Sequence, residues 1–239
     1  MKRVGIIGGM GPEATVLLMQ KLLRAVHAVD DADHIPLIVD QNPQVPSRIR
    51  YLIEGAGEDP APTLAAMAAN LERAGALAIA MPCNTAHHFA SEIRAAITVP
   101  FIDMVQLSTV RAVQAGGAVG ILASPAVQKV GLFDHALQGQ GARALYPSDQ
   151  TALLSAIRSL KSAGPNPAAL ATLMAASEEL RKKGAAITMI ACTEFSLLAS
   201  EVPAAFDTLD VLVKAITDFA TNPTKTATGR PNKEQPGHA

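Results

Sequence analysis

Two stretches of similar sequence decide the fold, VGIIGGMGP at residues 4–12 and VGILASP at residues 119–125. Each opens with a short aliphatic run that is typical of a strand buried on both faces of a sheet. Each continues into small residues and a proline, which suits the first turn of a helix. A strand that leads through a short loop into a helix is the repeating unit of a parallel sheet. The repeat therefore predicts two related α/β lobes that face each other.

The rest of the chain extends this pattern, because short aliphatic runs alternate with longer, alanine-rich stretches of helical period. Strands are expected at residues 3–7, 37–40, 76–81, 101–102, 118–122, 142–145 and 185–190. Helices are expected at residues 12–26, 62–74, 84–95, 105–115, 128–138, 151–162, 167–183 and 209–220. The prediction is an α/β fold of two pseudo-symmetric lobes, each with a parallel sheet flanked by helices.

The expected domain boundaries follow from the repeat. Residues 1–104 with 208–221 form the first lobe, and residues 105–207 form the second. Residues 222–239 turn to Thr, Lys, Asn, Pro and Gly without an apolar period, so a disordered tail is predicted there.

Composition narrows the possible partners. The chain has 239 residues, is 49% hydrophobic and carries a formal net charge of −1. That balance weighs against nucleic acid and anionic membranes as partners. The N-terminus does not resemble a signal peptide, and no apolar run is long enough for a membrane helix. A cytoplasmic protein is expected, in which a disulfide between the two cysteines would be unusual.

The two cysteines occupy equivalent places in the repeat. Cys83 lies in PCNT at residues 82–85, and Cys192 lies in ACTE at residues 191–194. A helix, a glycine and a strand precede each of them, and Gly75 and Gly184 lie eight residues before their respective cysteines. In open parallel sheets, ligands bind beyond the carboxyl ends of the strands, where both cysteines are expected.

A thiol between a strand and a helix start lies near unpaired backbone N–H groups, which predicts a lowered pKa for Cys83 and Cys192. A cysteine that merely packs well is the plain alternative, but duplication of the whole context favours function. Neither cysteine has the neighbours of a zinc or CxxC redox site. Two facing thiols suit proton transfer at a carbon, because racemisation needs a base on one side and an acid on the other.

At this point the sequence resembles the aspartate/glutamate racemase family over residues 4–220. The resemblance rests on GGMGPEAT at 8–15, PSR at 46–48, PCNTAH at 82–87 and ACTE at 191–194. It implies an active site in the cleft between two lobes, no pyridoxal phosphate or metal cofactor, and a homodimer. It also implies racemisation of a small-molecule acidic amino acid, aspartate first and glutamate second.

The resemblance assigns roles to individual residues. Cys83 and Cys192 match the acid/base pair. Substrate-binding positions match Met10, Gly11, Arg48, Asn84, Thr85, Lys161, Thr193 and Glu194. Among these, Arg48 and Lys161 match positions that bind carboxylates, although Arg50 and Arg158 lie close enough in sequence to compete for them.

Three neighbouring residues have less definite roles. Glu194 has two readings, as a partner of the substrate ammonium or as a residue that favours a helix start. His87 and His88 are kept outside the catalytic set, because a histidine in the first turns of a helix is more often structural.

Three other functions stay open. GMGPEA at residues 9–14 satisfies a GxGxxA pattern with Asp40 at the end of the next expected strand, which would suit a dinucleotide-binding oxidoreductase. A related superfamily enzyme such as a hydantoin racemase, a maleate isomerase or a malonate-type decarboxylase is a closer alternative. A catalytically silent amino-acid-binding protein is the third, although it would not need both cysteines.

Overall fold

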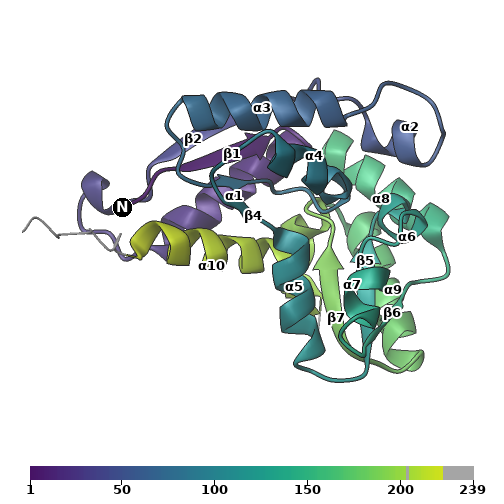
Figure 1. The fold of residues 1–239 in the computed structure, drawn as a ribbon. Helices are drawn as coiled ribbons and strands as arrows, with labels where there is room; N and C mark the ends of the chain where they lie inside the picture. The colour runs from purple at the N-terminus through teal and green to yellow at the C-terminus, as the bar shows by residue number, and fades with distance from the viewer. Residues whose placement is uncertain (203–204, 223–239) are drawn as a thin grey trace, which may run out of the picture.

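The computed structural model describes residues 1–202 and 205–222. Two four-stranded sheets form the framework, with strand orders β2-β1-β3-β4 and β6-β5-β7-β8, and every pairing is parallel. The strands are β1 (Val4–Gly8), β2 (Leu37–Gln41), β3 (Ile79–Ala80), β4 (Phe101–Ile102), β5 (Ala118–Ala123), β6 (Arg143–Leu145), β7 (Ala185–Ala191) and β8 (Ala205–Asp207). The shared strand order confirms the predicted pair of pseudo-symmetric α/β lobes, which Figure 1 shows side by side.

Helices cover both faces of each sheet. They are α1 (Pro12–Ala25), α2 (Arg48–Leu52), α3 (Ala61–Arg73), α4 (Ala90–Ala95), α5 (Met104–Val113), α6 (Pro125–Lys129), α7 (Asp134–Gln138), α8 (Gln150–Ala163), α9 (Pro167–Lys182) and α10 (Thr208–Thr221). The described residues also contain the 3₁₀ turns η1 (Asp31–Asp33), η2 (Thr85–Phe89) and η3 (Phe195–Glu201). Within residues 1–202 and 205–222, no helix combines the length and the apolar character that a membrane crossing requires.

Four apolar clusters hold these layers together, one on each face of each sheet. In the first lobe, α3 covers one face and α1 with α10 covers the other, where Leu18, Leu212 and Ile216 are fully buried. In the second lobe, α8 and α9 cover one face and α5 with α7 cover the other. Because α10 contributes most to the first-lobe cluster, we propose that residues 208–221 belong with 1–104 and that 105–207 form the second lobe.

The loop after β1 depends on one glycine. Gly9 has a φ of +93° and its N–H donates to Thr15 Oγ1 at 3.0 Å, which ties the loop to the first turn of α1. A Cβ at Gly9 would lie 2.4 Å from the carbonyl carbon of Asn42, so this position has no room for a side chain. Gly75 and Gly184, the paired glycines of the repeat, also adopt left-handed φ values of +95° and +85°.

Several expected elements are shorter or broken in the structure. The strand expected at 76–81 pairs only over Ile79–Ala80, and the helix expected at 84–95 divides into η2 and α4. The helix expected at 128–138 divides into α6 and α7 around Gly131, whose φ of +63° ends the first piece. Sequence analysis missed β8 and α2, since both are short and flanked by loops. Apart from Asn222, the tail expected at 222–239 lies outside the described residues.

Asp207 joins β8 to α10 and is 4% exposed. Its Oδ1 accepts hydrogen bonds from Leu209 N and from Ser196 Oγ, both at 2.8 Å. Burial raises the pKa of the Asp207 carboxyl to about 6, although these hydrogen bonds and Lys21 act in the opposite direction. In the folded protein Asp207 therefore holds its proton to a higher pH than in the unfolded chain.

This shift predicts a pH-dependent stability. Between about pH 4 and pH 6 the folded state binds more protons at Asp207 than the unfolded state, so the free energy of unfolding should rise as the pH falls through this window. The full contribution of about two pKa units is on the order of 3 kcal/mol. Asp207→Asn can still cap α10 and should reduce the dependence of the unfolding free energy on pH, which urea titrations at pH 4.5 and 7.5 measure. Asp210→Asn changes an exposed carboxylate of the same first turn and is the control. It should leave the dependence of the unfolding free energy on pH unchanged.

Candidate active site

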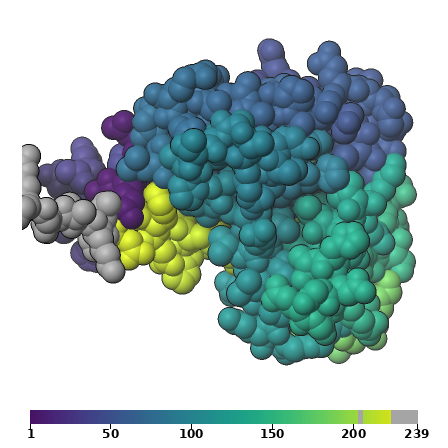
Figure 2. Space-filling view, viewed as in Figure 1, coloured from purple at the N-terminus to yellow at the C-terminus, as the bar shows by residue number. Residues whose placement is uncertain are grey.

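One cleft lies between the two lobes, where α2, α6 and α8 approach one another (Figure 1). It encloses about 310 Å³ of space between protein atoms, its open mouth included. The lining residues are Met10, Arg48, Ile49, Cys83, Thr85, Ser124, Ile157, Lys161, Cys192 and Glu194. The lobes pack closely together on the face that Figure 2 shows. Many of the lining side chains come from the loops that follow β1, β3, β5 and β7.

The structure brings seven of the residues expected at the site into this lining. Ile49, Ser124 and Ile157 also line it, and sequence analysis did not assign them. Ser124 had a usable signal, because it lies in the second copy of the repeated strand-loop sequence, and its Oγ lies 2.9 Å from Thr85 Oγ1. Ile49 and Ile157 had none, since an aliphatic side chain on a helix does not reveal which surface it covers.

Three expected residues do not line the cleft. Asn84 is buried and its Nδ2 donates to Thr208 Oγ1 at 3.0 Å, while Thr193 Oγ1 donates to the Pro82 carbonyl oxygen at 3.1 Å. Thr193 thereby ties the end of β7 to the loop after β3. Gly11 lies close by, since a Cβ there would approach Glu194 Oε1 to 3.8 Å. Asn84 Nδ2 and Thr193 Oγ1 therefore connect loops and lobes in this conformation, whereas Asn84 Oδ1 is buried without a hydrogen-bond partner among the described residues.

Cys83 follows β3 and is 7% exposed. Burial raises the pKa of its thiol, and the Glu194 carboxylate adds to this effect, while the cations of Arg48 and Lys161 oppose it. Its backbone is fixed by His87, whose Nδ1 lies 2.8 Å from the Cys83 carbonyl oxygen and whose Nε2 accepts from Met104 N at 3.2 Å. Because Nε2 accepts, the imidazole proton is on Nδ1, and His87 serves as a neutral link.

Cys192 follows β7 and is 6% exposed. Its Sγ donates a hydrogen bond to Glu194 Oε2 at 3.1 Å, and Lys161 Nζ lies 3.1 Å from Glu194 Oε1. Burial raises the pKa of the Cys192 thiol well above its usual range, and the charge and hydrogen bond of Glu194 raise it further. Glu194 makes no side-chain cap on η3, and each oxygen of its carboxylate instead has one contact, with Lys161 or with Cys192.

The expected lowering of both thiol pKa values is wrong in this conformation. The cysteines are followed by the 3₁₀ turns η2 and η3, and one backbone N–H, of Ala86 or of Glu194, lowers the pKa of each thiol, but this effect is the smaller one. Burial is the largest effect on both thiol pKa values. It raises them because removing a sulfur from water disfavours the charged thiolate.

Two cations face the cleft, and their positions distinguish them from their neighbours. Arg48 begins α2, and its Nη1 donates to the carbonyl oxygens of Val45 and Pro46 at 3.3 and 3.1 Å. Its Nε is buried without a hydrogen-bond partner among the described residues. Arg50 and Arg158 are exposed instead, and each lies 3.9 Å from a carboxylate oxygen of Glu54. Burial lowers the pKa of Lys161, but the charge and hydrogen bond of Glu194 and the charges of Cys192 and Cys83 together raise it by more, so the pKa of Lys161 is raised.

Comparison with known proteins places this architecture in a family. A sequence profile of Asp/Glu/hydantoin racemases matches residues 7–216. The broad specificity amino-acid racemase RacX of Bacillus subtilis is 26% identical over 220 residues, which cover 84% of this chain and 90% of that protein. An aspartate racemase structure from Picrophilus torridus aligns with a TM-score of 0.82 at 28% identity, covering 92% of this chain and 94% of that one.

A second solved structure shares the fold at lower identity. An aspartate racemase homologue from Pyrococcus horikoshii aligns with a TM-score of 0.73 at 21% identity over 93% of this chain and all of that one. Family membership supports an amino-acid racemase, which is an isomerase. Because the profile spans both lobes, from the end of β1 to the last turns of α10, the chain belongs to the Asp/Glu/hydantoin racemase family.

Proposed function

We propose that this protein racemises an acidic amino acid, aspartate first and glutamate second, by proton transfer between two thiols and without a cofactor. One observation carries the proposal: Cys83 and Cys192 come from equivalent loops of opposite lobes and line one cleft together with Arg48 and Lys161. Thiols from opposite lobes can reach opposite faces of a bound Cα, as racemisation requires.

The surroundings of the two thiols suggest their starting states. Burial raises the pKa of both thiols, but Glu194 holds the Cys192 proton whereas the cation of Arg48 partly offsets the burial of Cys83, so Cys83 is the thiol that ionises first. In one direction the Cys83 thiolate removes the Cα proton, forming an S–H bond as the C–H bond breaks. The Cys192 thiol then delivers its proton to the other face of Cα. The reverse reaction starts with the two protonation states exchanged.

The remaining groups of the cleft supply charges that match an acidic amino acid. Arg48 has a buried N–H without a partner, and Lys161 carries a second cation, so two carboxylates have two cationic partners. Glu194 has the opposite charge, which suits the substrate ammonium. The hydroxyl pair of Thr85 and Ser124 adds donors for an oxygen of the α-carboxylate. The cleft is small, as an amino acid requires.

Solvent isotope exchange tests this function. In deuterated buffer without added cofactor, the protein should place deuterium at Cα of both L- and D-aspartate, which mass spectrometry measures while polarimetry follows the loss of optical rotation. Glutamate, alanine and a hydantoin should be run beside aspartate, because RacX is described as having broad specificity. Racemisation of the hydantoin with no exchange of aspartate or glutamate would instead assign the protein to the alternative substrate class.

Two further expectations belong to this proposal. We propose a cytoplasmic enzyme, since Cys83 and Cys192 are both buried free thiols that a reducing compartment preserves. We also propose a homodimer, because α1 exposes the apolar side chains of Val16, Met19 and Leu23 at 47%, 38% and 55%. Sedimentation equilibrium should give twice the mass of the chain, and a monomer at micromolar concentration would contradict the dimer.

A further inference from the structure

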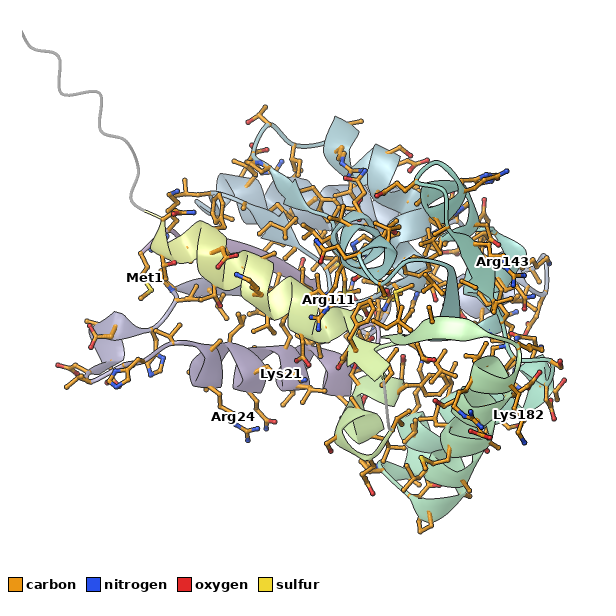
Figure 3. All side chains as sticks on the ribbon, turned by 90° about the horizontal axis from the view of Figure 1, so that it is seen from below. Met1, Lys21, Arg24, Arg111, Arg143 and Lys182 are labelled. Atoms are coloured by element: carbon orange, nitrogen blue, oxygen red, sulfur yellow. The ribbon has the colours of Figure 1, made fainter. Side chains whose placement is uncertain are left out.

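A second pocket lies at the junction of the two lobes, bordered by α1, α5, α10, β8 and η3. It encloses about 590 Å³ between protein atoms, its open mouth included, and its polar or aromatic lining comprises Lys21, Arg111, Ser200, Phe206, Asp207 and Asp210. None of these residues lines the cleft that holds the cysteines. Lys21 belongs to α1 and Arg111 to α5, and both are labelled in Figure 3, which views the molecule from below. The pocket is thus separate from the proposed active site.

A buried carboxylate oxygen in this pocket lacks a hydrogen bond. Asp207 is 4% exposed, and although its Oδ1 has two donors, its Oδ2 has no hydrogen-bond partner among the described residues. The nearest cation, Lys21 Nζ, is 3.6 Å from Oδ2 and lies closer to Asp210, at 2.5 Å from Oδ1 of that residue. A buried carboxylate oxygen without a donor is costly, so a ligand N–H that reaches this atom from the pocket would stabilise it.

A cation on another wall of the pocket also lacks an ionic partner. The guanidinium carbon of Arg111 lies 4.7 Å from the centre of the Phe206 ring, which positions the group at the pocket. Arg111 is an exposed residue, and it makes no ion pair or side-chain hydrogen bond with the part of the chain that the structure describes. A guanidinium in this state offers a pair of parallel N–H donors to a carboxylate.

The pocket has two cationic and two anionic side chains, and the cations lie on different elements from the anions. Lys21 and Arg111 are cationic and lie on α1 and α5, while Asp207 and Asp210 are anionic and lie at the start of α10. A simple anion would be repelled by the two carboxylates, and a simple cation would be repelled by Lys21 and Arg111. A small molecule that carries both charges satisfies both sets of groups.

We propose that this pocket binds a small zwitterionic amino acid, with its ammonium group on Asp207 Oδ2 and its carboxylate on Arg111. Lys21 and Asp210, already paired, border the ligand. The turn η3 joins this pocket to the active cleft, because Glu194 directly precedes it and Ser200 lies near its end. The binding site stands on this geometry alone and does not depend on racemase activity.

Equilibrium dialysis of the full chain with labelled L-alanine tests the proposal, because alanine carries the two charges and little else. Because the cleft that holds the cysteines could also take alanine, the number of saturable sites per chain is counted, and both wild type and Arg48→Gln should show the site of the second pocket at millimolar alanine. Arg111→Gln and Asp207→Asn, each made in the Arg48→Gln background, should weaken binding at this one site at least tenfold and leave any binding in the cysteine cleft unchanged. Arg143→Gln, at an exposed arginine of β6, is the matched control and should change nothing.

Ligands that lack one charge provide a second readout that needs no variant. N-acetyl-L-alanine and L-alaninamide should each bind at least tenfold more weakly than alanine. Affinity should also fall below about pH 6, where Asp207 takes up a proton and loses its attraction for ammonium, while Lys21, Arg111 and Asp210 border the same site. The proposal is overturned if wild type shows no saturable binding, or if binding is indifferent to Arg111→Gln and to removal of either ligand charge. Absence of racemisation would leave these outcomes unaffected.

Discussion

Replacing either Cys83 or Cys192 by serine should lower kcat/KM for aspartate racemisation by about 10²- to 10⁴-fold in both directions, the range that a positioned acid or base contributes. The serine hydroxyl has nearly the same shape, but it is a far weaker acid than a thiol and does not ionise at working pH. Both sites are buried, at 7% and 6% exposure, so the smaller oxygen fits without rearrangement. Polarimetry with both enantiomers gives the rates.

Isotope exchange separates the roles of the two thiols. A variant that keeps one thiol can still remove a proton from one face of Cα and return deuterium to that same face. Cys83→Ser and Cys192→Ser should therefore exchange the Cα proton of opposite enantiomers while racemising neither at the wild-type rate. Thr109→Ser, at a buried residue outside the cleft, is the control for loss of stability and should retain full activity. Equal exchange of both enantiomers by each variant would contradict the two-thiol mechanism.

The pH profile should reflect the raised thiol pKa values. Burial raises the pKa of both thiols, so raising the pH from 7 increases the fraction of enzyme with one thiolate, and kcat/KM should rise with it. The rate should fall again where the second thiol ionises, because no acid then remains. For a given enantiomer, the increase of kcat/KM with pH should be lost in the serine variant that lacks the thiol acting as the base.

Arg48→Gln should lower kcat/KM for aspartate by about 10- to 100-fold, the loss expected when a charged hydrogen bond worth about 1.5–3 kcal/mol is removed. Arg48 has a buried Nε without a partner and lies in the cleft beside Cys83 and Lys161. If it binds the side-chain carboxylate, the rate for alanine should change much less, because alanine has no such group. Initial rates with both substrates measure the difference.

Arg50→Gln is the matched control for Arg48→Gln. It lies on the same short helix but is exposed and faces Glu54, so its removal should leave both rates within twofold of wild type, as surface charges of this kind contribute little. An equal loss with alanine and aspartate in Arg48→Gln would place Arg48 at the α-carboxylate. In that case the preference for acidic substrates would have to come from Lys161.

The sequence by itself determined the framework of this protein. Buried aliphatic runs followed by small residues define β1 and β5, and the equal spacing from Gly75 to Cys83 and from Gly184 to Cys192 reveals the duplication. These signals are local, because a strand buried on both faces and a glycine at positive φ impose their own residue types. The two-lobed α/β fold followed from them, while the family resemblance rested on the motifs at residues 8–15, 46–48, 82–87 and 191–194, and both are confirmed.

Tertiary structure decided the chemistry of the cleft. Lys161, Cys192 and Glu194 come together from α8 and the loop after β7, and the resulting contacts raise the Cys192 pKa where the local sequence predicted a lowered one. Asn84 and Thr193, expected to face a ligand, instead hydrogen-bond within the protein. A pKa depends on desolvation and on neighbouring charges. Both are set by which distant segments pack around a group, and that information is not contained in the residues beside it.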